Sequence, residues 1–96
     1  MAISRNGVEV SGHARHGPYG SDIVCAAVSA LTITLSESLR ALDPACDPSS
    51  VMEEGHARIT VRNMTDKAET LIDAFYIGTL RLSEAYPEAI DKIQII

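Results

Sequence analysis

The sequence predicts a small α+β fold in the order ββαββα, with an antiparallel sheet and both helices packed on one face. Apolar and polar residues alternate near the N-terminus and again around residue 60, which is typical of half-buried strands. Each of these stretches precedes a long segment whose apolar residues recur every three or four positions, as in a helix. A chain of 96 residues has room for one hydrophobic core, so a single domain over residues 1–96 is expected.

A strand or short hairpin is expected over residues 3–13. Val8 and Val10 point to one side of this strand and Glu9 to the other. Asn6-Gly7 is a strong hairpin signal. Only five residues precede it, so the first strand of that hairpin is expected to be short or missing.

The strand leads into a loop over residues 14–20, where Gly17-Pro18 and Gly20 break regular structure. If the strand continues through Gly12, His13 lies on its polar side. A bulge at Gly12 would instead turn His13 to another direction.

A helix is expected over residues 21–42, with Ser21 or Asp22 capping its N-terminus. Its first half is apolar on nearly every side, so one small sheet cannot cover it, and a homodimer is expected. The main apolar stripe consists of Val24, Val28, Leu31, Leu35, Leu39 and Leu42.

A loop rich in proline and short polar residues is expected over residues 43–50, and a second hairpin over residues 51–63. A second helix is expected from Asp66, as the cap of a capping box, to about Tyr86. Residues 90–96 are expected to add a short edge strand.

The composition excludes several classes of function. A net charge of −5 argues against direct nucleic-acid binding, which needs a basic face, and is compatible with a basic protein partner. The N-terminal segment lacks the apolar core of a signal peptide, and the longest apolar run is shorter than a membrane span, so a cytoplasmic protein without membrane contact is expected. Cytoplasmic thiols stay reduced.

Cys25 is the candidate nucleophile and His13 the candidate general base. Near a helix N-terminus, unpaired backbone N–H groups and the helix dipole favour the thiolate. An imidazole beside such a thiolate can protonate a leaving amine. Taken without the surrounding motif, Cys25 is better explained as a small core residue, and His13 without Cys25 as an exposed strand-end histidine.

Three further residues are candidates for the same site. Asp22 lies three positions before Cys25 on a similar helix face, where it either orients the histidine or only caps the helix. A carboxylate close to the sulfur would also disfavour the thiolate. Ser29 is one turn beyond Cys25 and would line the site, and Gly20 would serve as a hinge of the loop.

No metal site is expected. The potential ligands are His13, His16, Cys25, Cys46 and His56, and they show no CxxC or HExxH spacing. Cys46 is a poor rival nucleophile, because Asp43 and Asp47 flank it.

One segment resembles the ribosomal-processing cysteine protease (Prp) family of bacteria. The matching residues are Gly12-His13-Ala14 and, after a short loop, Gly20-Ser21-Asp22-Ile23-Val24-Cys25-Ala26-Ala27-Val28-Ser29-Ala30. The resemblance implies a cysteine endopeptidase that removes a short N-terminal extension from a large-subunit ribosomal protein, with Cys25 and His13 as the catalytic pair and no cofactor. A non-catalytic protein that binds the same ribosomal protein remains the alternative.

Overall fold

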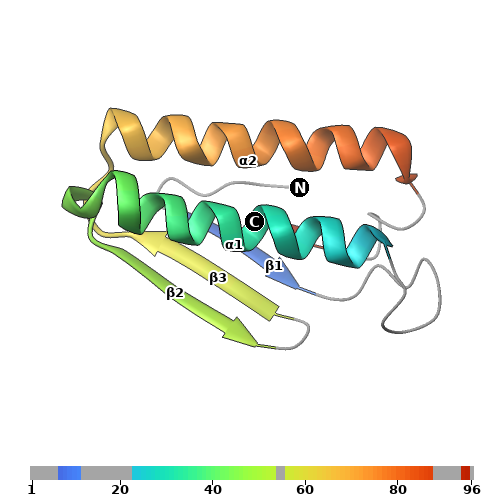
Figure 1. Cartoon of the computed structure of the whole chain (residues 1–96), viewed down its shortest axis with the longest axis horizontal. Helices are drawn as coiled ribbons and strands as arrows, with labels where there is room; N and C mark the ends of the chain where they lie inside the picture. Colours follow the sequence, from blue (N-terminus) through green and yellow to red (C-terminus); the bar gives the residue numbers. More distant parts are fainter. Residues whose placement is uncertain (1–6, 12–22, 54–55, 88–93, 96) are drawn as a thin grey trace.

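The computed structural model describes residues 7–11, 23–53, 56–87 and 94–95 of the chain. These residues form an α+β fold in which two long helices lie over an antiparallel sheet (Figure 1). The elements in chain order are β1 (Gly7–Ser11), α1 (Ile23–Leu42), the 3₁₀ turn η1 (Pro44–Cys46), β2 (Pro48–Glu53), β3 (His56–Val61), α2 (Asp66–Ala85) and β4 (Gln94–Ile95).

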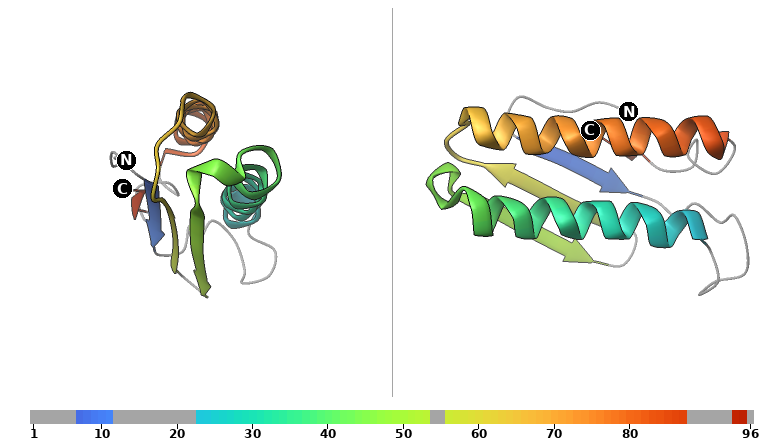
Figure 2. Two further views of the ribbon diagram at one scale, coloured as in Figure 1. Left: turned by 90° about the vertical axis from the view of Figure 1, so that its left-hand side faces the viewer. Right: turned by 45° about the horizontal axis from the view of Figure 1, so that its top comes forward.

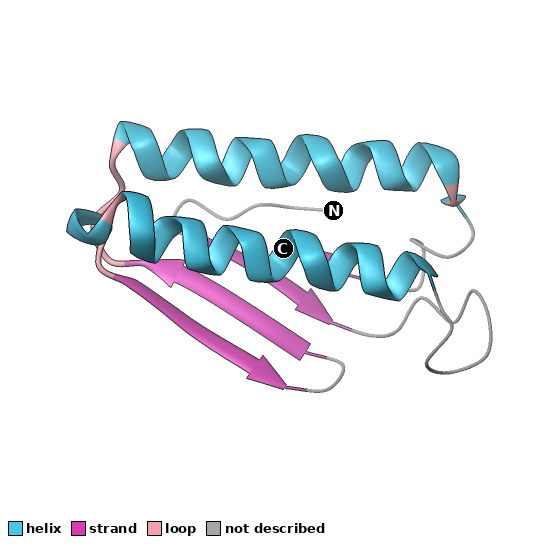
Figure 3. Ribbon diagram, in the orientation of Figure 1, coloured by secondary structure: helices cyan, strands magenta, loops and turns pink. Residues whose placement is uncertain are grey.

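The strands are ordered β2-β3-β1-β4, and every neighbouring pair is antiparallel. Three strands make up most of the sheet, and the two-residue β4 extends it beside β1. Both helices cover the same face, as the end-on view of Figure 2 and the colouring of Figure 3 make plain. The expected fold class, the antiparallel sheet and the shared helix face are therefore confirmed.

The expected element order ββαββα is wrong, because a single described strand precedes α1. Residues 3–6, where the other strand of the first hairpin was expected, lie outside the described part of the chain. Gly7 is the first residue of β1 and pairs with Thr60 of β3. A Cβ atom at Gly7 would lie 2.1 Å from the carbonyl oxygen of Ile59. The close approach of β1 to β3 thus accounts for this glycine, which the sequence had placed in a turn.

The second hairpin is confirmed, but it begins earlier than expected. Residues 43–50 were expected to be a loop, whereas the chain makes a 3₁₀ turn and enters β2 at Pro48. Asp47 ends the turn with a φ of 53°, and its N–H donates to the carbonyl of Pro44. Proline is tolerated at Pro48 because it is the first residue of an edge strand.

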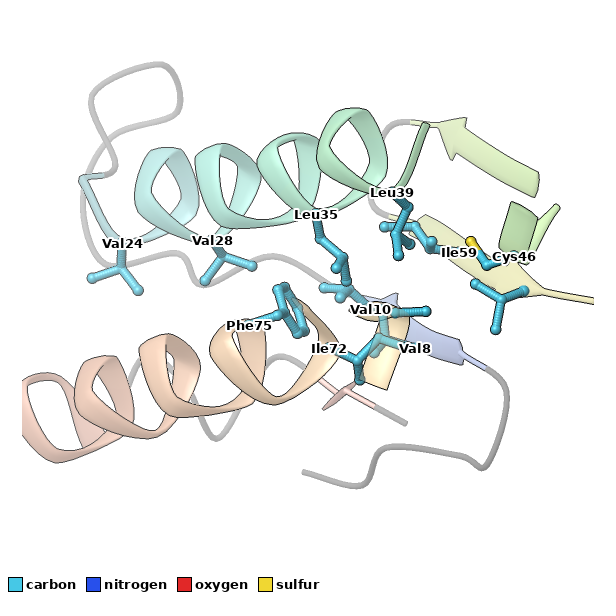
Figure 4. Close-up of a cluster of buried hydrophobic side chains, with 12 residues drawn as sticks. Val8, Val10, Val24, Val28, Leu35, Leu39, Cys46, Ile59, Ile72 and Phe75 are labelled. Carbon is cyan, nitrogen blue, oxygen red and sulfur yellow. The ribbon is translucent and has the colours of Figure 1, made fainter. Parts of the chain in front are cut away.

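Helix α1 ends at Leu42 as expected and packs its apolar stripe on the sheet and on α2 (Figure 4). Leu42 itself is 56% exposed, so the stripe ends one turn earlier. Two polar residues, Thr32 and Ser36, are buried beside it. Thr32 Oγ1 donates to the carbonyl of Val28, and the Ser36 hydroxyl lies 2.6 Å from that of Ser50 on β2. These hydrogen bonds satisfy the buried hydroxyls.

Helix α2 is capped by Thr65, not by Asp66 as expected. Thr65 Oγ1 accepts the N–H of Ala68 at 3.0 Å, and its hydroxyl donates to the buried carboxylate of Asp43 at the end of α1. The Thr65 side chain therefore ties the end of one helix to the start of the next while it caps α2. The face of α2 that enters the core carries Ala68, Ile72, Phe75 and Thr79.

One helix, α1, is long and apolar enough to cross a membrane by length and composition alone. The core helix of a globular protein passes the same test, and α1 contributes Val24, Val28, Leu35 and Leu39 to the hydrophobic core. No apolar run of spanning length was expected from the sequence, so this property of α1 was not predicted.

Candidate active site

Cys25 is the third residue of α1, so the expected position of the thiol in the first turn is confirmed. Its side chain is half-buried and packs against the edge of the hydrophobic core. The first turn of α1 contains no acidic residue. Backbone N–H groups at a helix start carry a partial positive charge, which favours an anion at this place. The position thus combines partial access with an electropositive helix end.

Ser29 lies one turn further along α1 and is exposed. Because residues four apart in a helix lie on the same face, its hydroxyl borders the surface near Cys25. Ser29 can therefore contact a molecule that approaches the Cys25 sulfur.

His13, Gly20 and Asp22 lie outside the described residues, so their roles stay predictions. The described residues fix the ends of the segment that carries them. β1 ends at Ser11, two residues before His13, and α1 begins at Ile23, one residue after Asp22.

Cys46 is a poor rival nucleophile, as the sequence predicted. The residue is buried in the core, and neither cysteine is in a disulfide. Burial of the thiol raises its pKa, and the neighbouring Asp43 carboxylate raises the pKa further. The sequence identified the acidic neighbours but not the burial, which is the larger cause.

His56 lies on the face of the sheet opposite the helices, so it is not placed to serve Cys25. Its Nε2 is 2.9 Å from the Glu9 carboxylate, and Arg58 donates to the same carboxylate oxygen at 2.7 Å from Nη2. These hydrogen bonds hold the pKa of the Glu9 carboxyl below its ordinary value. The bond to His56 has the larger effect and the bonds from Arg58 the smaller one. The cluster therefore stabilises the sheet at neutral pH, and this contribution is lost as the pH falls through the lowered pKa.

The described part of the chain contains no group of three His, Cys, Asp or Glu side chains that is arranged to hold a metal ion. Two of the potential ligands named from the sequence, His13 and His16, fall outside it.

Comparison with known proteins identifies relatives of the whole fold. Residues 3–91 match the family model described as cysteine protease Prp. The ribosomal processing protease Prp from S. aureus, crystallised with a covalently linked product peptide, is 28% identical, with a TM-score of 0.80 over 91% of this chain and 88% of that one. The same enzyme with a substrate peptide gives 27% identity and a TM-score of 0.74 over 90% and 87% of the two chains.

The crystal structure of another protein, SMU.848 from Streptococcus mutans, is 40% identical to this chain. It gives a TM-score of 0.72 over 86% of this chain and 77% of that one. A search of curated proteins found no match.

Proposed function

The chain belongs to the Prp family of cysteine proteases, and we propose that it cleaves its substrate through Cys25, with His13 as the general base. The observation that carries this proposal is the position of Cys25, half-buried in the first turn of α1. The other thiol, Cys46, is buried and has a raised pKa. Family membership favours this protease over the non-catalytic binding protein that the sequence left open.

The proposed reaction has two steps. The Cys25 thiolate attacks the carbonyl carbon of the scissile bond, the C–N bond breaks, and the His13 imidazolium gives its proton to the leaving amine. Water then attacks the thioester, His13 takes a proton from that water, and the acid product leaves as the thiolate forms again. No redox partner or cofactor is needed.

Three neighbouring residues support these steps in the proposal. Asp22 accepts a hydrogen bond from His13 and holds its ring in place. Ser29 contacts the bound peptide, which its exposure beside Cys25 supports. Gly20 is a hinge that lets the loop before α1 close over the substrate.

The sheet register places a condition on the proposed catalytic pair, Cys25 and His13. Val8 and Val10 are buried under the helices, so Glu9 points to the opposite face. A strand that continued regularly from Ser11 would carry His13 on the same side as Glu9, away from α1. The proposal therefore requires the chain to leave strand register at Gly12, where a glycine permits a bulge.

The proposed substrate is the precursor of a large-subunit ribosomal protein with a basic N-terminal segment. The S. aureus relative is a ribosomal processing protease, and the net charge of −5 of this chain complements a basic substrate. Such a substrate implies action in the cytoplasm. Exposed apolar side chains on α1, among them Ile33 and Leu42, support a homodimer.

The experiment that tests this function uses the ribosomal protein precursor from the same genome. We expect the purified enzyme to shorten the precursor by its N-terminal extension, which intact-mass spectrometry detects. His13→Ala is expected to slow this reaction by about 100-fold or more, since a general base contributes that much. A precursor that keeps its full mass after long incubation with the wild-type enzyme would contradict the proposed substrate. The substrate peptide crystallised with the S. aureus enzyme provides a second, shorter test of peptidase activity.

A further inference from the structure

Strand β2 has one side that no other described strand pairs with, because it lies at the end of the order β2-β3-β1-β4. The Arg62 N–H donates to the Asp47 carbonyl at 3.3 Å, which joins the residues on either side of the Pro48–Val61 pair. Pro48 and Val61 therefore form a non-hydrogen-bonded pair, which suits a proline because it has no N–H. The alternation of an antiparallel pair then directs the backbone N–H and C=O groups of Ser50 and Met52 away from β3. These groups can hydrogen-bond an added strand.

Between Pro48 and Glu53, which protect its two ends, this edge carries two exposed apolar side chains. Val51 is 46% exposed and Met52 is 44% exposed. They are neighbours in a strand, so they point to opposite faces of the sheet. Proteins usually blunt such edges with charges, prolines or a covering element, and an exposed apolar edge otherwise promotes association with another chain.

Met52 lies on the face that carries the helices. It pairs with Ala57, which pairs in turn with the buried Val10. Ser50, two residues earlier, contacts Ser36 of α1 through their hydroxyls, so α1 covers the start of β2. In the end-on view of Figure 2, the lower ends of β2 and β3 extend beyond both helices. Met52 is nevertheless 44% exposed, so α1 does not cover the end of β2 as it covers Ser50. Strand β2 also runs toward the end of the molecule at which α1 begins (Figure 1).

We propose that this edge of β2 binds an extended segment of the substrate peptide as an added strand, and that Met52 contacts an apolar side chain of that segment. The inference rests on the proposed peptidase function and assigns part of its substrate site. Strand addition to a sheet edge supplies main-chain hydrogen bonds, while side-chain contacts at alternate positions give specificity. The exposed Glu53 at the end of β2 adds a negative charge that suits a basic peptide.

A short peptide fits this edge better than a second copy of the chain. Within β2, only Ser50 and Met52 direct both an N–H and a C=O away from β3, since Pro48 lacks its N–H. A stable dimer buries about 800 Å² on each partner, which is more than a strand of this length offers by itself.

The first test compares Met52→Ser with Ile77→Ser, using the substrate peptide named above. Ile77 is 57% exposed on α2 and belongs to no proposed site, so it controls for the loss of an exposed apolar side chain. We expect Met52→Ser to raise KM about tenfold with kcat nearly unchanged, and Ile77→Ser to change neither. Thermal melting should be nearly the same for both variants, because both side chains are exposed.

The second test leaves the protein unchanged and methylates single backbone nitrogens of the peptide, away from the scissile bond. An added strand turns every second N–H toward β2, so we expect methylation to weaken binding at alternate positions only.

An unchanged KM in Met52→Ser, or binding losses without this alternation, would overturn the proposal. Conversion of a dimer to a monomer by Met52→Ser at unchanged KM would assign the edge to a second copy and would also overturn it. A wild-type protein that binds the peptide with this alternation but never cleaves it would instead refute the peptidase function and retain the binding site.

Discussion

Replacing Cys25 with alanine is expected to abolish peptide cleavage while the fold and the affinity for the peptide persist. The proposed mechanism gives Cys25 the covalent step, and loss of a catalytic nucleophile typically lowers kcat by about 10⁴-fold or more. The fold should persist because Cys25 is only half-buried and lies at the edge of the core. Turnover is measured with purified Cys25→Ala, and peptide affinity by fluorescence anisotropy.

Cys46→Ala is the matched control. It removes the other thiol, which is fully buried, so it is expected to lower the free energy of unfolding but to leave kcat near the wild-type value in the folded fraction. If Cys25→Ala kept a substantial fraction of the wild-type rate, or if Cys46→Ala alone abolished turnover, the nucleophile would be assigned to the wrong residue.

Replacing Phe75 with alanine is expected to cause the largest loss of stability. Phe75 is buried and is the only phenylalanine of the chain, and it fills the space between the two helices and the sheet (Figure 4). Removing a buried aromatic ring costs about 3–5 kcal/mol through lost transfer energy and the cavity that remains. A chain of this length is stable by only about 5–15 kcal/mol, so a large share of the total is at stake.

Urea unfolding monitored by circular dichroism measures this loss, with Tyr76→Ala as the control on the same helix. Tyr76 is exposed, so its removal is expected to change the free energy of unfolding by less than about 1 kcal/mol. Equal losses in the two variants would contradict the packing described for α2.

The strongly periodic elements could be predicted from the sequence, and the contacts between elements could not. Helix α1 ends where its pattern ends, and the second hairpin follows its alternating residues. Gly7 was misread because local turn chemistry and a close approach to the Ile59 carbonyl both select glycine. The cap of α2 was placed one residue late, because the Thr65 side chain also bonds Asp43, far away in the sequence.

In the candidate site, too, the local features could be predicted from the sequence and the contacts between elements could not. The position of Cys25 in the first turn follows from local helix signals, and the structure confirms it. The burial of Cys46 depends on how η1 packs under the core, which no local pattern encodes. The path of the chain from Ser11 to His13 depends on register, and only the sheet reveals that the polar side of β1 faces away from α1.

The most direct test of the central claim, that Cys25 is the activated thiol and depends on His13, is the rate of alkylation of each cysteine at neutral pH. Iodoacetamide labelling is followed by mass spectrometry of the peptides that contain Cys25 and Cys46, in the wild-type protein and in His13→Ala. We expect Cys25 to react much faster than the buried Cys46, whose pKa is raised, and to slow markedly in His13→Ala. Equal rates for the two cysteines, or a Cys25 rate that does not change in His13→Ala, would contradict the account.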